Sequence, residues 1–477
     1  MSIDNALGLE HTYAAALEGL YAPIDPAGFP QPALLLLNRP LATALGLDPA
    51  WLEAHGAAVL SGSAVLEGTR PLAQAYAGHQ FGHFNPELGD GRALLLGEVV
   101  DPAGHRFDLH LKGAGTTPFS RQGDGRAALD SALREYIVSE AMHALGIPTT
   151  RSLAVVTTGE TVLRQRAAPG AVLTRVAASH LRIGTLELFA SLDDRDALQR
   201  LVQYSLQRHY PERAHGGAVA LLEAVASAQA RLIARWMAVG FVHGVMNTDN
   251  VALSGETIDF GPCAFMDAYD PDTVFSQIDQ QGRYRFGHQP GIGAWNMARM
   301  AEALLELLAD DRQAAIELGQ ATLDRFQSEL RATWLDLMRA KLGLPGAEDD
   351  DGALIQALLD AMARARADYT LTFRRLADGL EHETQPDLHP EIRAWLPRWR
   401  ARLGASAPKQ MNQVNPLYIP RNHKVEEALS AALAGDLGPT TRLLEVLARP
   451  FEAQPGCEAY AEPAPESFGC YQTHCNT

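Results

Sequence analysis

The chain has 477 residues, of which 47% are hydrophobic and 20% are charged, and its formal net charge is −17. A chain of this length can bury more than one core, and its acidic balance argues against a general nucleic-acid binder, which needs clustered Lys and Arg. Four cysteines in so long a chain also exclude a scaffold that is held together by disulfides.

The first residues, Met1 to Tyr21, lack a basic leader followed by an apolar stretch, so we expect no secretory signal. No apolar run approaches the length of a membrane span. We therefore expect a cytoplasmic protein whose partners include neither a membrane nor a nucleic acid.

Residues 1–86 are rich in Ala and Leu and are interrupted by Pro and Gly, which predicts short helices and loops. Two strands are then expected at 93–100 and 106–112, joined by a turn at 101–104. Apolar side chains alternate along the second strand, so Lys112 at its end faces the opposite side.

A glycine-rich loop at 113–125 leads into a helix predicted at 126–145. Two strands follow at 152–157 and 161–166, joined by a turn at 158–160, and a third strand is expected at 171–176. The remaining pattern is mainly helical, with an acidic loop at 348–352. Long amphipathic helices are predicted at about 218–239, 294–308, 312–342 and 353–380.

This order predicts an α+β protein with a protein-kinase-like bilobal fold. We expect a small N-lobe, made of an antiparallel sheet with one helix, and a larger, mainly helical C-lobe. The predicted units are an N-terminal extension packing on the core (1–86), the N-lobe (87–178), the C-lobe (179–400), and a C-terminal extension with a flexible tail (401–477).

The strongest motif runs from His243 to Asn250 and is followed by Asp259-Phe260-Gly261. In protein kinases the catalytic loop reads His-x-Asp, four residues, then Asn, and the Asn and the Asp of Asp-Phe-Gly hold metal ions. Here Val245 occupies the place of the catalytic base, and a valine cannot accept a proton. Asp249, beside Asn250, offers a carboxylate close by, so the pattern predicts a metal site at Asn250 and Asp259 with altered chemistry.

Lys112 on its strand and Glu135 in the next helix fit the kinase ion pair that steers a lysine toward phosphates, with Glu140 as a competing partner. Further nucleotide contacts are candidates only in combination, because alone each would be a turn or a surface arginine. These candidates are Gly89, Gly91, Arg92, Asp124, Gly125, Arg175 and Arg182.

Five blocks of this sequence closely resemble the selenoprotein O family, a kinase-like family that transfers AMP from ATP to protein hydroxyl groups. The blocks run through most of the chain: Tyr76–Gly82, Leu88–Ala93, Leu111–Arg121, His243–Asn250 and Asn415–His423.

The resemblance implies that Asp249 is the proton acceptor, that Asn250 and Asp259 hold Mg²⁺ or Mn²⁺, and that Lys112 contacts phosphates. It also implies that ATP binds in an inverted orientation, with Gly89, Gly91, Arg92, Asp124, Gly125, Arg175, Arg182 and Asp259 around it. The expected products are pyrophosphate and an AMP-modified Ser, Thr or Tyr. Three alternatives stay open: a phosphotransferase that uses Asp249, transfer of UMP from UTP, and a nucleotide-binding pseudokinase scaffold.

Eukaryotic members of that family carry selenocysteine third from the C-terminus, where this chain has Cys475. Cys263 follows the Asp-Phe-Gly motif, so a regulatory Cys263–Cys475 disulfide is a candidate. The alternatives are a buried Cys263 beside an unrelated tail thiol and, less favoured, a metal site at Cys470, His474 and Cys475.

Overall fold

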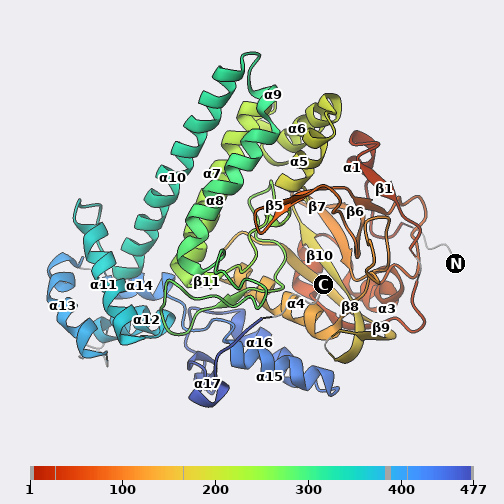
Figure 1. Cartoon of the computed structure of the whole chain (residues 1–477). Coiled ribbons are helices and arrows are strands. Elements are labelled where there is room, and N and C mark those ends of the chain that lie inside the picture. Colours follow the sequence, from red (N-terminus) through yellow and green to blue (C-terminus); the bar gives the residue numbers. More distant parts are fainter. Residues whose placement is uncertain (1–4, 27, 165, 382–387, 405–406, 474–477) are drawn as a thin grey trace.

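The computed structural model describes residues 5–26, 28–164, 166–381, 388–404 and 407–473 (Figure 1). An eight-stranded sheet lies on one side of the molecule, on the right in Figure 1. Its strand order is β1-β3-β6-β7-β10-β9-β2, β8 pairs in addition with β10, and every paired neighbour is antiparallel. The strands are β1 (Tyr21–Pro23), β2 (Ala33–Leu37), β3 (Leu72–Gln74), β6 (Ala93–Val100), β7 (Arg106–Lys112), β8 (Ala127–Ala128), β9 (Arg151–Leu163) and β10 (Ala167–Ala177).

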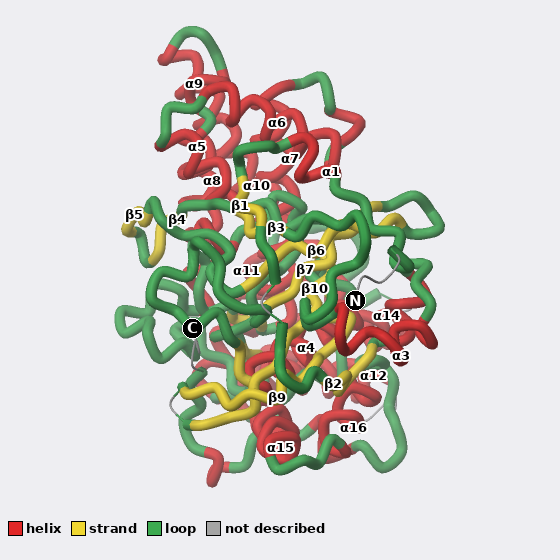
Figure 2. The backbone as a smooth tube through the Cα atoms, turned by 90° about the vertical axis from the view of Figure 1, so that its right-hand side faces the viewer, coloured by secondary structure: helices red, strands yellow, loops and turns green. Residues whose placement is uncertain are grey.

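Two small two-stranded units complete the strands. A hairpin of β4 (Gly78–Gln80) and β5 (His83–Asn85) lies apart from the main sheet, as Figure 2 shows. The second unit pairs β11 (Phe241–Val242) with β12 (Ala264–Phe265) on either side of the kinase-like loop.

Helices α1 to α4 come before or between the sheet strands in the chain, and the remaining helices follow β10 and make up most of the second half (Figure 1). They are α1 (Thr12–Ala16), α2 (Arg39–Ala44), α3 (Pro49–Val59), α4 (Leu129–Ala144), α5 (Ile183–Ser191), α6 (Arg195–His209), α7 (Gly217–Val239), α8 (Gln289–Ala303), α9 (Leu305–Leu308), α10 (Arg312–Leu342), α11 (Asp351–Ala365), α12 (Tyr369–Glu381), α13 (Pro390–Arg402), α14 (Ala407–Val414), α15 (Asn422–Leu433), α16 (Gly438–Leu447) and α17 (Glu458–Ala461).

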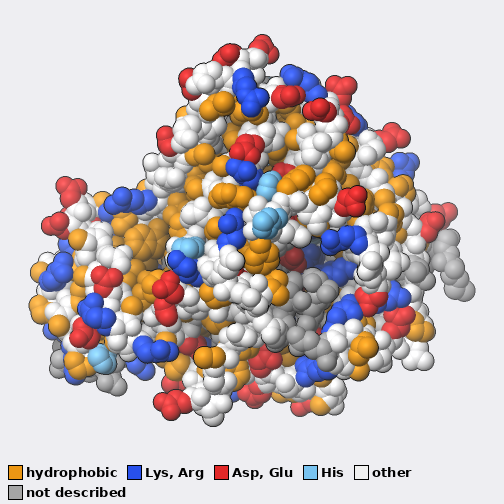
Figure 3. Space-filling view, viewed as in Figure 1, with side chains coloured by type: hydrophobic (Ala, Val, Ile, Leu, Met, Phe, Trp, Pro, Cys, Tyr) orange, Lys and Arg blue, Asp and Glu red, His pale blue; other side chains and the backbone are white. Residues whose placement is uncertain are grey.

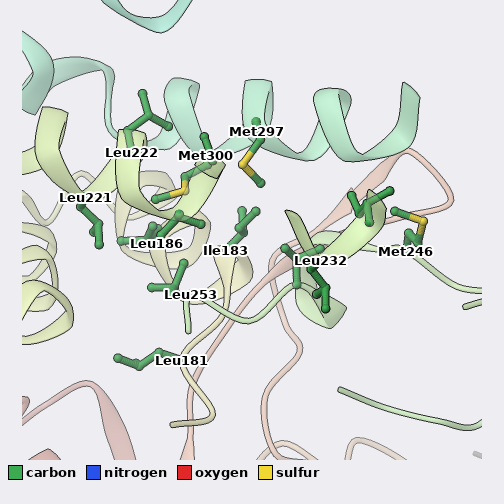
Figure 4. Packing of buried hydrophobic residues seen from close by; sticks show 14 of the residues in the cluster. Leu181, Ile183, Leu186, Leu221, Leu222, Leu232, Met246, Leu253, Met297 and Met300 are labelled. Carbon is green, nitrogen blue, oxygen red and sulfur yellow. The ribbon is translucent and has the colours of Figure 1, made fainter. Parts of the chain in front are cut away.

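The largest buried cluster lies in the helical half, where α7 packs against both α8 and α10. Apolar side chains from α5, α7, α8 and the loop around Met246 interdigitate there. This core therefore packs directly against the loop His243–Asn250, which we call the catalytic loop. Figure 4 labels Leu181, Ile183, Leu186, Leu221, Leu222, Leu232, Met246, Leu253, Met297 and Met300. Helix α7 is long and apolar enough to cross a membrane by length and composition, but 61% of that stretch is buried inside the molecule.

The structure is α+β and is consistent with the kinase-like layout expected from the sequence. On the face seen in Figure 3, acidic and basic side chains are interspersed.

Four expectations about local structure were wrong, one of them the single helix at 294–308, which is α8 followed by α9. Residues 1–86 contribute β1, β2 and β3 to the main sheet, because strands of three to five residues carry little periodic signal. The turn expected at 158–160 is absent, since β9 runs unbroken from Arg151 to Leu163 and Gly159 instead lets Gln31 approach closely. The helix expected at 353–380 is two helices, because Arg366 is left-handed (φ 48°) and the Asp368 side chain caps the next helix by accepting from Leu371 N.

The C-terminal extension packs on the sheet's own helix. Helices α15 and α16 bury apolar side chains against α4, together with Cys457. Arg421, just before α15, is fully buried, and its Nη1 donates to Asp267 and Asp368, each at 2.6 Å. Its guanidinium therefore joins three segments that lie far apart in sequence.

We predict that Arg421→Ala lowers the free energy of unfolding by about 3–5 kcal/mol, because it leaves two carboxylates partly buried without their counter-charge. Denaturant midpoints of the two proteins measure this. Arg364→Ala removes an arginine that is 61% exposed and paired with Glu391, and it should cost no more than about 1 kcal/mol. Equal losses of unfolding free energy in the two variants would show that the buried ion pairs of Arg421 do not stabilise the fold.

Candidate active site

A buried group of four charges joins the sheet, α4 and the Asp-Phe-Gly segment. Lys112 Nζ at the end of β7 lies 2.7 Å from Glu135 Oε2 on α4 and 3.1 Å from Asp259 Oδ1. Arg175 on β10 donates to both carboxylates, with 2.8 Å from its Nη2 to Asp259 Oδ1. Glu140, the competing partner for Lys112, instead binds Arg151 at 2.7 Å.

The electrostatics of this group favour an incoming anion. Burial alone would raise the pKa values of both carboxyls, but Arg175 and Lys112 lower that of Glu135 to about 2. Lys112 and Arg175 likewise hold the pKa of Asp259 well below its usual value, and Arg92 and Arg182 act in the same direction. Four cations thus act on Asp259, whose side chain is 31% exposed while those of Lys112, Arg175 and Glu135 are nearly covered.

Asp259 also has a rare backbone conformation, with φ of 69°. A non-glycine residue in the left-handed region costs free energy that the surrounding structure has to offset. The bonds from Lys112 and Arg175 to Oδ1 hold the carboxylate in this position.

Asp249 lies in the short 3-10 turn Thr248–Asn250 and is almost fully buried. Burial raises the pKa of its carboxyl to about 6, against the lowering effect of Arg182. Arg182 is itself buried and donates from Nη1 to the Asp249 backbone oxygen at 2.9 Å, while its guanidinium stacks on Tyr76. The carboxylate is therefore mostly ionised at neutral pH and has an affinity for protons higher than that of an ordinary Asp.

The two candidate metal ligands offer oxygen atoms. Asn250 donates from Nδ2 to the carbonyl oxygen of Val245 at 3.0 Å, so its amide oxygen remains the group for a cation. Together with the Asp259 carboxylate this donor set suits Mg²⁺, which binds few protein oxygens and takes its other ligands from phosphates and water. Among the described residues no cluster of three or more His, Cys, Asp or Glu side chains could hold a metal ion.

The predicted glycine positions permit close packing of two loops. A Cβ atom on Gly89 would lie 2.5 Å from the ring of Phe119, and one on Gly91 would lie 2.8 Å from the Phe119 carbonyl oxygen. Thr117 Oγ1 also donates to the Asp90 carbonyl oxygen at 2.7 Å, so the loop 113–125 folds directly over the first glycine pair.

The second candidate pair lies at the outer end of that loop. Gly125 packs against the Gly115 backbone, and exposed Asp124 accepts two bonds of 2.8 Å from Arg164. These bonds lower the pKa of Asp124 to about 2. Asp124 is thus bound to Arg164 in this conformation, and the nucleotide contacts of Asp124 and Gly125 stay a prediction.

The hairpin β4–β5 contacts the catalytic loop, which was not predicted from the sequence. Consecutive hairpin residues bind consecutive residues of the catalytic loop: Phe81 N donates to Asn247 Oδ1 (3.1 Å) and Gln80 Nε2 to Asp249 Oδ2 (3.2 Å). His79 N donates to Thr248 Oγ1 at 2.7 Å. The sequence block 76–82 was a signal for the family only, because nothing local in it reveals a partner 169 positions away.

Strand β4 fits into a slot that only glycine lining allows. A Cβ atom on Gly78 would lie 2.6 Å from Asp249 Oδ1, and one on Gly184 would lie 2.2 Å from the Ala77 carbonyl oxygen. Ala77 N donates to Gly184 O at 2.9 Å, which fixes the strand between α5 and the catalytic loop.

The structure describes one of the two cysteines of the candidate disulfide, Cys263. Cys263 is buried and its pKa is raised by burial to about 12, so this thiol is unreactive in the present conformation. Cys475 and His474 lie outside the described residues, and no disulfide joins the cysteines that the structure does describe, Cys263, Cys457 and Cys470. Thr473 Oγ1 donates to Pro262 O at 2.7 Å, so the described chain ends next to Cys263, and the disulfide stays a prediction.

Comparison with known families decides the class of this site. The family model described as "Protein adenylyltransferase SelO" matches residues 5–448. The chain belongs to this SelO family.

Three relatives of this SelO-family chain carry the name "Protein nucleotidyltransferase YdiU". The one from Cereibacter sphaeroides strain KD131 is 58% identical, covering 98% of this chain and 99% of its own length. That from Rhodopseudomonas palustris strain BisB5 is 53% identical with the same coverage. That from Rhizobium etli strain CIAT 652 is 53% identical over 99% of this chain and 98% of its own. The SelO-family chain is therefore an enzyme, a protein nucleotidyltransferase.

For this SelO-family enzyme we predict that Gly78→Ala lowers turnover by about 100-fold, because the added methyl displaces the Asp249 carboxylate or the hairpin from its place. Gly78 does not have a positive φ, so backbone strain is not part of the effect. The control is Gly291→Ala, where a Cβ atom meets nothing within 4 Å and activity should be unchanged. Initial rates and thermal midpoints of both variants make the comparison, and normal turnover by Gly78→Ala would show that the slot does not position Asp249.

Proposed function

We propose that this protein transfers AMP from ATP to hydroxyl groups of Ser, Thr or Tyr on proteins and releases pyrophosphate. One observation carries the proposal: Asp249, with a raised pKa, lies in the same loop as Asn250 while Lys112 and Arg175 converge on Asp259. The family's description as a protein adenylyltransferase supports AMP as the transferred group.

In the acceptor step the substrate hydroxyl gives its proton to Asp249 as its oxygen attacks the α phosphorus of ATP. The new oxygen–phosphorus bond replaces the bond between the α phosphorus and the bridging oxygen, and that electron pair leaves with pyrophosphate. Asp249 suits this role because its pKa of about 6 lies closer to neutrality than that of an ordinary Asp.

On the donor side Lys112, Arg92, Arg175 and Arg182 supply positive charge toward the phosphates. Preorganised cations stabilise the charge that builds on the leaving pyrophosphate. Asn250 and Asp259 would hold Mg²⁺ or Mn²⁺, which when bound neutralises phosphate charge. The inverted orientation of ATP belongs to this proposal and rests on the family resemblance.

A labelling experiment separates the alternatives. With ATP labelled at the α or the γ phosphate, we expect only the α label to reach protein, whereas a phosphotransferase would transfer only the γ label. Intact-mass measurements with ATP and with UTP distinguish AMP, UMP and phosphate, since the relatives' name does not specify the nucleotide. Nucleotide binding with no transfer of any group would overturn the proposal in favour of a pseudokinase scaffold.

We predict that the isosteric variants Asp249→Asn and Asp259→Asn fail in different ways. Asp249→Asn should keep the KM for ATP and lose about 10²- to 10⁴-fold in turnover, because a general base acts on the acceptor hydroxyl. Asp259→Asn should lose transfer together with Mg²⁺-dependent ATP affinity, because it loses an anionic ligand.

ATP titrations with and without Mg²⁺, followed by initial rates, test both. Ordinary turnover by Asp259→Asn at saturating Mg²⁺ and ATP would refute its role at the metal. The partners we propose are ATP and proteins with exposed hydroxyl residues, and the cytoplasmic location stays a prediction.

A further inference from the structure

Arg283 is a cation beside the catalytic loop, where its side chain contacts the neighbouring Tyr284. Its Nε and Nη2 atoms are buried without a hydrogen-bond acceptor, and within the described part of the chain its guanidinium has no carboxylate partner. Buried donors of this kind are rare in native proteins and call for an explanation. The lack of a partner is more unusual because the protein carries a net charge of −17.

Neighbouring arginines do have carboxylate partners. Arg285 Nε lies 3.1 Å from Asp272, and Arg299, which also stacks on Trp295, binds Glu302 through Nη2, although its Nε is likewise buried without an acceptor. Arg283 is held by stacking instead, with its guanidinium carbon 4.8 Å from the centre of the Trp295 ring. Stacking fixes the guanidinium plane and leaves its hydrogen-bond donors available.

The position of Arg283 connects it to the acceptor step. A Cβ atom on Gly82, at the hairpin tip, would lie 3.5 Å from the guanidinium carbon. The next residue, Tyr284, donates from its hydroxyl to Asn247 Oδ1 at 2.6 Å, and the same hydroxyl accepts from Phe81 N. Arg283 is therefore one residue from a side chain that binds the catalytic loop two positions before Asp249.

The arginine is also fixed in place and reachable. Asp279 Oδ1 accepts from Arg283 N at 2.9 Å and Asp279 Oδ2 accepts from Tyr284 N at 2.7 Å, which anchors the loop backbone. Arg283 and Trp295 are both partly exposed, as is His79, whose ring packs edge-on against Trp295. The residue is accessible only in part, and Nε and Nη2 are covered, so an incoming carboxylate reaches these donors when the neighbouring side chains shift.

We propose that Arg283 is a specificity-determining residue that binds a carboxylate of the acceptor protein, an Asp or Glu near the hydroxyl that receives the nucleotide. This inference rests on the proposed function for the transfer step, and it adds the class of protein segment that the site accepts. A carboxylate satisfies the unmet donors and is bound in a bidentate manner by a guanidinium.

The test uses acceptor peptides that differ only in one residue beside the hydroxyl, which is Asp, Asn or Lys on either side. With the wild-type enzyme we expect kcat/KM for the best Asp peptide to exceed that of its Lys counterpart by about tenfold. Arg283→Glu should reverse the preference and Arg283→Gln should abolish it. Arg283→Lys should retain a weaker preference for Asp, because lysine keeps the charge without the planar fork.

The matched control is Arg285→Gln, which removes a nearby arginine that already has a carboxylate partner and should keep the wild-type preference. The KM for ATP should be unchanged in all these variants, and a raised KM in Arg283→Gln would instead place the residue at the nucleotide. Fluorescence anisotropy of labelled peptides measures the same preference as affinity, without the need for transfer. Equal affinities for Asp and Lys peptides would overturn this inference alone, whereas a preference for Asp without transfer of any nucleotide would count against the proposed function.

Discussion

The buried charge group of Lys112, Glu135, Arg175 and Asp259 is the constraint on which the rest of the structure depends. A buried charge that loses its partner is costly, so two strands, α4 and the segment after Ile258 all have to be in register at once. The group has two positive and two negative members, and Arg92 and Arg182 add further positive potential at Asp259. A polyanion is thus the ligand that this balance favours.

The C-terminal extension contacts α4 next to the buried charge group, and these contacts help to keep Glu135 in register. Arg134, next to Glu135 on α4, donates to the backbone oxygens of Cys263 and Gly261, and its Nη1 donates to the Tyr471 hydroxyl at 2.6 Å. Tyr471 in turn donates to Glu426 on α15 at 2.7 Å. Helix α4 is therefore held by the C-terminal extension through Arg134, while the adjacent Glu135 binds Lys112 and Arg175.

Sequence alone predicted the strongly periodic parts. Strands β6 and β7 and the long helix α10 have the predicted bounds, and the kinase spacing led to Lys112 and Glu135, which the structure joins directly. The short strands of residues 1–86 lack a period long enough to recognise. Gln80 and Arg283 could not be found because their significance lies in contacts with residues distant in sequence, or in the absence of an expected partner within the described residues.

The slot that receives β4 has a consequence for how this enzyme can be divided. Residues 87–400 contain every kinase-like motif, yet the strand that lies against Asp249 comes from the segment before them. A fragment limited to the kinase-like region would remove the hairpin donors that now bind Asn247, Thr248 and Asp249, and would leave the glycine-lined slot open to water. The residues that position Asp249 therefore extend beyond the kinase-like region and include the hairpin before it.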